Sequence, residues 1–187
     1  VVGERVWREL NVAPCITFET LPRKKKAIGT AQSLGKNLSD LATIEEACAY
    51  YISETSEVLR SQKCCCTYLQ VFLTTNYHSL YDNQYRDSKT ITLAVPTNNT
   101  FILISEGKRA LKMIYKEGYR YKKVGVNLLG LIPENQVQGN LFASEPTVNP
   151  SLISTFDAIN NRYGKSTVSA GLSGTKESKK EWELIKE

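Results

Sequence analysis

Residues 64–75, CCCTYLQVFLTT, decide the fold of this chain. Two sets of side chains alternate within them. Leu69, Val71 and Leu73 form one set, and the other is Tyr68, Gln70, Phe72 and Thr74. Because successive side chains of a strand point to opposite faces, this alternation predicts a β-strand whose first set lies in a core.

Similar elements lie on both sides of this strand. The expected elements, in chain order, are a strand at 24–35, a helix at 43–60, strands at 64–75 and around 90–95, a helix at 100–117 and a strand at 121–131. This order predicts an α+β, ferredoxin-like βαββαβ domain, in which a four-stranded antiparallel sheet carries two helices on one face. Short appendages are expected at the N- and C-terminal ends of the chain.

The helix at 43–60 has the clearest pattern of these elements. Thr43 and Glu46 predict a capping box at its start. Its expected inward face consists of Ile44, Ala47, Cys48, Tyr51, Ile52, Thr55, Val58 and Leu59. A helix with one such apolar face packs that face against a sheet.

Charge is segregated between the strands and this helix. The strand stretches of 23–133 carry basic residues and no acidic one, whereas the helix holds Glu45, Glu46, Glu54 and Glu57 against Arg60 alone. If the helices cover one side of the sheet, the other side is open and positive. Such a face is suited to a polyanion, although the net charge of the chain is only +5.

The open face should also carry hydrogen-bonding groups. The side chains expected to point outward are Gln70, Thr74, Thr90, Thr92, Lys123 and Asn127. Ser33 and Gly35 join the candidates because small residues let backbone N–H groups approach a phosphate. The candidate DNA contacts are Lys24, Lys25, Lys26, Ser33, Gly35, Lys36, Arg86, Lys89, Lys122 and Lys123.

Catalytic and metal-binding chemistry is not indicated. The five cysteines, three of them adjacent, suit neither a disulfide framework nor a zinc site and indicate a reducing cytoplasm. His78, the single histidine, falls in a polar hairpin connection, and the expected strands offer no carboxylate pair for two metal ions. No apolar run approaches the ~20 residues that span a bilayer. We therefore expect a binding module that is not an enzyme and needs no cofactor.

Two other readings of the residues remain. A positive sheet could dock an acidic protein partner, and the salt dependence of DNA binding separates that scaffold from a DNA-binding module. An independent ferredoxin-like enzyme such as a phosphatase would need an anion-cradling loop with a placed Arg and Asn, and the sequence shows none.

Several stretches resemble the C-terminal part of UmuC-type translesion DNA polymerases of the Y family. Residues 1–10, VVGERVWREL, resemble the last helix of the thumb, and 24–131 resemble the little finger, with QSLG at 32–35 and YRYKKVGV at 119–126. QGNLF at 138–142 is similar to the sliding-clamp-binding peptide of these proteins, although Gly139 stands where a larger residue is usual. TFDAINNRYG at 155–164 resembles the start of their C-terminal extension, without its usual ending.

The resemblance implies a division of the chain into four parts. These are the end of the thumb at 1–20, the DNA-binding little finger at 23–133, a linker with the clamp motif at 134–150 and the C-terminal extension at 151–187, whose last residues from Gly171 on are expected to be mobile. It also implies an error-prone polymerase of damage tolerance and SOS mutagenesis in the bacterial cytoplasm, with primer-template DNA, the sliding clamp and a processed UmuD-type subunit as partners. Gln138, Leu141 and Phe142 would contact the clamp, whereas the palm that holds Mg²⁺ is not part of this sequence.

Overall fold

The computed structural model describes residues 2–15, 25–139, 150–174 and 182–183. Its helices and strands, in chain order, are α1 Val2–Leu10, β1 Ala27–Leu38, α2 Leu41–Ser61, β2 Cys64–Thr75, β3 Arg86–Thr97, α3 Thr100–Ile114, β4 Tyr121–Pro133, η1 Glu134–Gln136, α4 Pro150–Tyr163 and η2 Gly171–Ser173. From β1 to β4 the chain order is the predicted βαββαβ. The expected first strand begins later than predicted, at Ala27.

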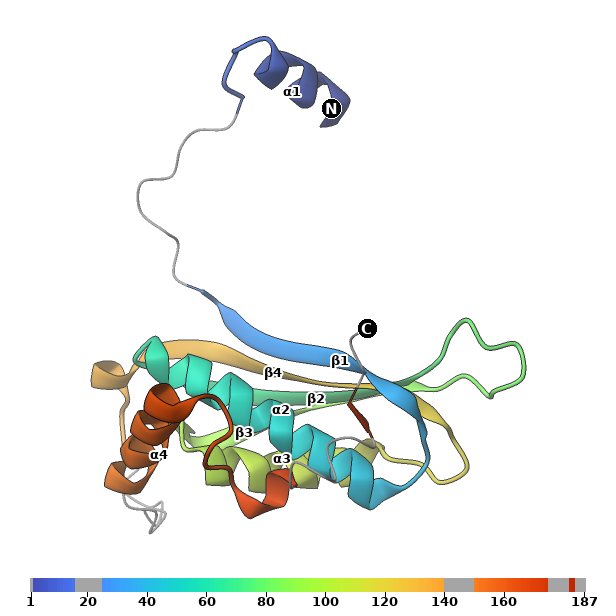
Figure 1. Ribbon diagram of the computed structural model, residues 1–187, viewed down its shortest axis with the longest axis vertical. Helices are drawn as coiled ribbons and strands as arrows, with labels where there is room; N and C mark the ends of the chain where they lie inside the picture. Colours follow the sequence, from blue (N-terminus) through green and yellow to red (C-terminus); the bar gives the residue numbers. More distant parts are fainter. Residues whose placement is uncertain (1, 16–24, 140–149, 175–181, 184–187) are drawn as a thin grey trace.

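The four strands form one antiparallel sheet in the order β1-β4-β2-β3. Helices α2 and α3 cover one face, as Figure 1 shows. The predicted α+β architecture is therefore confirmed. The chain order did not fix which strands are central; they are β4 and β2, and β1 and β3 lie at the edges.

The core lies between the sheet and these two helices. Leu69, Val71 and Leu73 are fully buried on β2, as the alternation predicted. Gly107 lets α3 approach α2 closely, because a Cβ there would lie 2.2 Å from Cδ1 of Ile52. Of the inward face predicted for α2, Val58 is the exception, with 40% of its surface exposed.

The start of α2 differs from the prediction. Asp40 is the N-cap, and its Oδ2 accepts hydrogen bonds from the Thr43 backbone N at 2.8 Å and from Thr43 Oγ1 at 2.7 Å. These bonds from Thr43 hold the pKa of Asp40 below its ordinary value. The predicted Thr43–Glu46 capping box is wrong, because Glu46 instead accepts a bond from Trp182 Nε1 at 3.0 Å.

The segment after the linker packs on the outer side of α2. Arg60 forms a two-pronged ion pair with Asp157 of α4, at 2.6 and 2.7 Å. Trp182 is buried against Tyr50 and Tyr51, with ring centroids 5.4 and 5.7 Å away. The expectation of a mobile end from Gly171 on is thus wrong for its described residues. A lone Trp in a polar, lysine-rich tail has no periodic neighbours that would predict burial.

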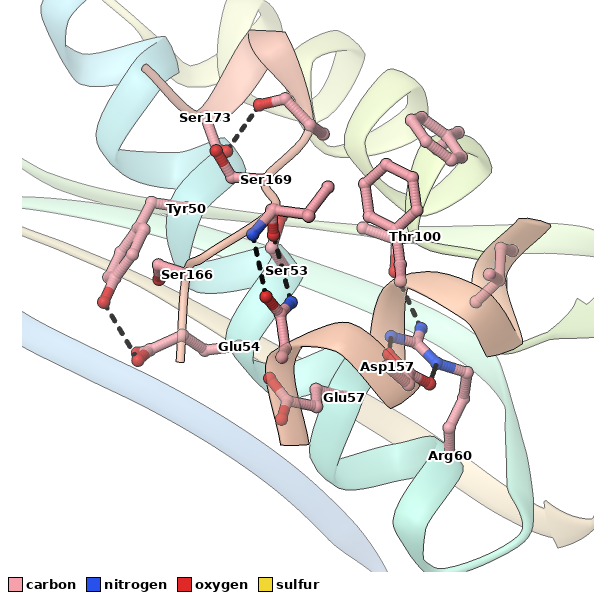
Figure 2. Close-up of a pocket in the computed structure, with 16 residues that line it drawn as sticks. Tyr50, Ser53, Glu54, Glu57, Arg60, Thr100, Asp157, Ser166, Ser169 and Ser173 are labelled. Atoms are coloured by element: carbon pink, nitrogen blue, oxygen red, sulfur yellow. Dashed lines mark hydrogen bonds and ion pairs between the residues drawn. The ribbon is translucent and has the colours of Figure 1, made fainter. Parts of the chain in front are cut away.

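A small hollow of about 60 Å³ remains in this seam. Figure 2 shows it between α2 and the C-terminal segment, with Arg60 and Asp157 meeting at one end. Asn160 closes the wall by exchanging two hydrogen bonds with the backbone of Val168, at 2.9 and 3.0 Å. Arg60, Asp157 and Asn160 thus use their polar groups in contacts with the protein, and the hollow lies on the helix side, away from the open face of the sheet.

Candidate nucleic-acid interface

The strand register arranges the open face of the sheet in four rows. Residues paired across antiparallel strands project to the same side. The rows, each in the order β1, β4, β2, β3, are Ser33-Lys123-Thr74-Arg86, Ala31-Gly125-Phe72-Ser88, Gly29-Asn127-Gln70-Thr90 and Ala27-Leu129-Tyr68-Thr92. All six side chains predicted to point outward lie in these rows.

The first row is the candidate phosphate-binding site, and we call it the phosphate row. It consists of Ser33, Lys123, Thr74 and Arg86, so one residue of each strand contributes. Two cations alternate with two hydroxyls across the width of the sheet. Cations and hydroxyls are the side chains that most often contact a nucleic-acid backbone, and they carry no sequence preference.

The third row forms a hydrogen-bonded ladder across three strands. Asn127 Nδ2 donates to Gln70 Oε1 at 2.9 Å, and Gln70 Nε2 donates to Thr90 Oγ1 at 3.3 Å. Gly29 on the edge strand makes room for it, since a Cβ there would lie 2.1 Å from Asn127 Oδ1. The ladder fixes a polar, uncharged surface, and the second row separates it from the phosphate row.

The second row has an aromatic ring at its centre. Phe72 lies across Gly125, where a Cβ would be 2.2 Å from Cζ of the ring and 2.7 Å from Cβ of Ala31. On the open face, the edge strand β1 presents only small side chains, those of Ala27, Gly29, Ala31 and Ser33. Its backbone can approach a ligand closely, as expected for Ser33 from the sequence.

One prediction about charge is wrong in detail. Strand β3 begins at Arg86 and contains Asp87, so the strands are not free of acidic residues. Asp87 pairs with buried Leu73 and thus projects to the helix side, where its Oδ2 lies 3.0 Å from the hydroxyl of Tyr85. Burial raises the pKa of Tyr85 to about 12, so this hydroxyl stays protonated near Asp87. The four rows themselves carry no acidic side chain.

The other predicted contacts fall into three groups. Lys24 lies outside the described residues, and Lys25 and Lys26 are exposed just before β1. Lys89 is exposed but pairs with buried Val71, which places it on the helix side of the edge strand.

The third group sits at an irregular end of β1 and β4. Between Ser33 and Leu38 the register shifts, and Gly35 and Lys36 are exposed there. Lys122 lies at a matching irregularity of β4, and its Nζ is 3.4 Å from the Gly35 carbonyl oxygen. These residues flank the phosphate row without belonging to it.

Only the first two residues of the predicted clamp motif, Gln138 and Gly139, are described. Gln138 is exposed after η1, and Gly139 has open space where a Cβ would stand. Leu141 and Phe142 lie outside the described residues. The preceding chain is anchored, because Glu134 N donates to the Lys63 carbonyl at 3.0 Å.

Some features of the surface were not anticipated from the sequence. The connection between β2 and β3 exposes Tyr77, Leu80 and Tyr81. The sequence predicts only a polar hairpin connection for this stretch. In the described part of the chain, no group of His, Cys, Asp and Glu could hold a metal ion, and no helix is long and apolar enough to cross a membrane.

Comparison with known proteins identifies the class. A family model described as the impB/mucB/samB family C-terminal domain matches residues 25–141, which contain the whole sheet and both of its helices. The chain belongs to this family.

Three curated relatives are similar over most of the chain. Protein ImpB of Salmonella typhimurium is 31% identical over 100% of this chain and 44% of its own length. Protein UmuC of Salmonella typhimurium strain LT2 is 29% identical over 90% of this chain and 40% of its own length. Protein MucB of Escherichia coli is 30% identical over 87% of this chain and 39% of its own length. The chain thus spans about two fifths of the length of these relatives.

Solved structures show more distant likenesses. A Y-family DNA polymerase chimera, Dbh-Dpo4(243-245)-Dbh, is 12% identical over 71% of this chain and 36% of its own, with a TM-score of 0.49. The little finger domain of PolIV, solved in complex with the beta-clamp processivity factor, is 14% identical over 63% of this chain and 99% of its own, with a TM-score of 0.43. The family assignment rests on the sequence matches.

Proposed function

We propose that the sheet domain grips the backbone of primer-template DNA as the little finger of an error-prone, translesion DNA polymerase. The observation that carries this proposal is the phosphate row, two cations and two hydroxyls on an acid-free face of the sheet. Membership of the impB/mucB/samB family supports the polymerase context. Residues 1–20 would then end the thumb, and 151–187 would be a C-terminal extension, of which Asp157 and Trp182 contact α2.

The binding would be independent of sequence. Phosphate contacts position a protein on DNA without reading bases, and the two amides of the rows, Asn127 and Gln70, are already engaged with each other in the ladder. A cytoplasmic bacterial protein of this kind would act in damage tolerance and SOS mutagenesis. A second part of the proposal is that residues 138–142 bind the bacterial sliding clamp, which would hold the polymerase on its template.

The salt dependence of duplex binding tests the first part. If about 3 to 5 phosphates are neutralised, log K falls against log salt with a slope of about −3 to −4.5. Fluorescence anisotropy with two duplexes of unrelated sequence gives this slope, and both duplexes should bind equally within about twofold. Salt-independent binding, or no binding at 50 mM salt, would contradict the proposal and favour docking of an acidic protein.

Primer extension tests whether this chain binds DNA without polymerase activity of its own. The purified chain should incorporate no nucleotide with Mg²⁺ or Mn²⁺, because two-metal catalysis needs carboxylates that hold both ions, and the described residues contain no such group. The control is a Y-family polymerase under the same conditions. Extension that follows the chain through purification would disprove this assignment.

A further inference from the structure

Three large side chains stand almost fully in solvent where β2 connects to β3. This hairpin tip, residues 76–84, exposes 79% of Tyr77, 93% of Leu80 and 97% of Tyr81. It is the green loop that projects past the end of the sheet in Figure 1. Single exposed apolar side chains are ordinary, but three such side chains in one short loop form a patch of the kind that marks a binding site.

Polar contacts hold the tip in one shape. The side-chain nitrogen of Gln84 lies 3.0 Å from the Asn76 carbonyl and 3.1 Å from the Ser79 carbonyl. Asn76 Oδ1 accepts from His78 N at 3.2 Å, and Ser79 Oγ accepts from Asp82 N at 3.2 Å. The exposed rings therefore stand on a backbone that is already ordered, which lowers the entropy lost when a ligand binds.

The chemistry of the tip favours a nucleic acid. Tyr77 and His78 place their ring centroids 3.8 Å apart. Asp82, the one acidic residue of the tip, is already engaged, since its carboxylate lies 3.4 Å from both Arg120 Nη1 and Asn37 Nδ2. The tip thus offers flat rings to solvent while its single negative charge is paired.

The tip is continuous with the phosphate row. Thr74 and Arg86 form the last pair of that row, and Thr75 N donates to the Tyr85 carbonyl at 3.0 Å just beyond them, where the tip begins. A nucleic-acid strand with its phosphates on Arg86 would meet the exposed rings next. In a duplex the base faces are covered by stacking, whereas an unpaired strand offers them to aromatic side chains.

We propose that the hairpin tip binds unpaired nucleotides of single-stranded DNA adjoining the duplex, by stacking bases on Tyr77 and Tyr81. The inference rests on the proposed function, because it continues the strand whose phosphates the row holds. Stacking tolerates any base, so this contact would extend the binding surface without adding sequence preference.

The test compares a blunt duplex with the same duplex carrying a single-stranded overhang of about ten nucleotides, within the range of known single-strand sites. The full chain should bind the overhang probe at least about fivefold more tightly, as base–aromatic stacking supplies. Tyr77→Ala with Tyr81→Ala should remove this gain and leave blunt-duplex affinity unchanged. Tyr77→Phe with Tyr81→Phe keeps both rings and should keep the gain. A 2-aminopurine base in the overhang should change fluorescence with the native chain but not with the alanine variant.

The outcomes separate the two proposals. If the blunt duplex binds with the expected salt slope but the overhang adds nothing, or if the gain survives in the alanine variant, stacking by the tip is overturned and the patch is left to a protein partner. If neither the blunt duplex nor the overhang probe binds, the result contradicts the proposed function and, with it, the stacking that depends on it. The control variant is Tyr163→Ala, which removes a tyrosine of α4 with 65% of its surface exposed. If this variant still binds the overhang probe more tightly than the blunt duplex, by the same factor as the native chain, the loss in the Tyr77–Tyr81 alanine variant is specific to the tip.

Discussion

Reversing both charges of the phosphate row, with Lys123→Glu and Arg86→Glu, should weaken duplex binding about 30- to 100-fold at low salt, which corresponds to about 2 to 3 kcal/mol. Each cation lost from a phosphate contact also lowers the steepness of the salt dependence by about one unit, so the slope should become shallower by about two. Both residues are on the open face, in the same row, so the glutamates would repel the backbone where it is held. Anisotropy titrations at several salt concentrations measure both quantities.

The matched control makes the same change in net charge elsewhere. Lys89 lies on β3, close to Arg86 in the chain, but projects to the helix side, and Lys165 is exposed after α4. Lys89→Glu with Lys165→Glu should cost only the small, screened effect of distant charges. If this control weakens binding as much as the row variant does, net charge governs the affinity and the assignment of the open face is wrong.

Replacing both apolar anchors of the clamp motif, with Leu141→Ala and Phe142→Ala, should abolish most binding to the bacterial sliding clamp. Two adjacent large apolar residues in a polar, proline-flanked linker are typical of a short peptide that docks in an apolar pocket. An extended peptide loses entropy on docking, and Gly139 increases that loss, so a micromolar affinity of about −7 to −8 kcal/mol is expected. A few anchors carry such interfaces, so the double variant should lose at least about tenfold.

Isothermal calorimetry with the clamp measures this loss. The matched control is Leu152→Ala with Leu172→Ala, which removes two exposed leucines from the C-terminal segment outside the motif. It should bind as the native chain does. Gln138, exposed beyond the anchored turn η1, should contribute less, through a hydrogen bond at the rim of the pocket. Equal affinity of the native chain and the Leu141–Phe142 variant would show that the motif is an ordinary linker.

Local periodicity was sufficient to predict the helices and strands, but it did not predict which residues pair across the strands. The alternation at 64–75 predicted which side chains of β2 are buried because a strand has only two faces. The same rule put Lys123 and Asn127 outward on β4. It could not foresee that Asp87 belongs to β3, since a polar strand end has no apolar alternation to mark it. The alternation that buries Ile91 and Leu93 also puts Lys89 on their side of β3, in agreement with its pairing with Val71, so Lys89 was not a consistent candidate for the open face.

The sequence by itself determined the order of strands and helices, the acidic character of α2, the outward polar set and, through its motifs, the family. These properties depend on neighbouring residues in the chain, which local periodicity and composition record. Only the tertiary structure decided that Ser33, Lys123, Thr74 and Arg86 form one row, that Trp182 packs against α2, and that Asp82 of the exposed tip contacts Arg120. The physical reason is that strand order, register and long-range packing join residues far apart in the chain, and no local pattern specifies such contacts.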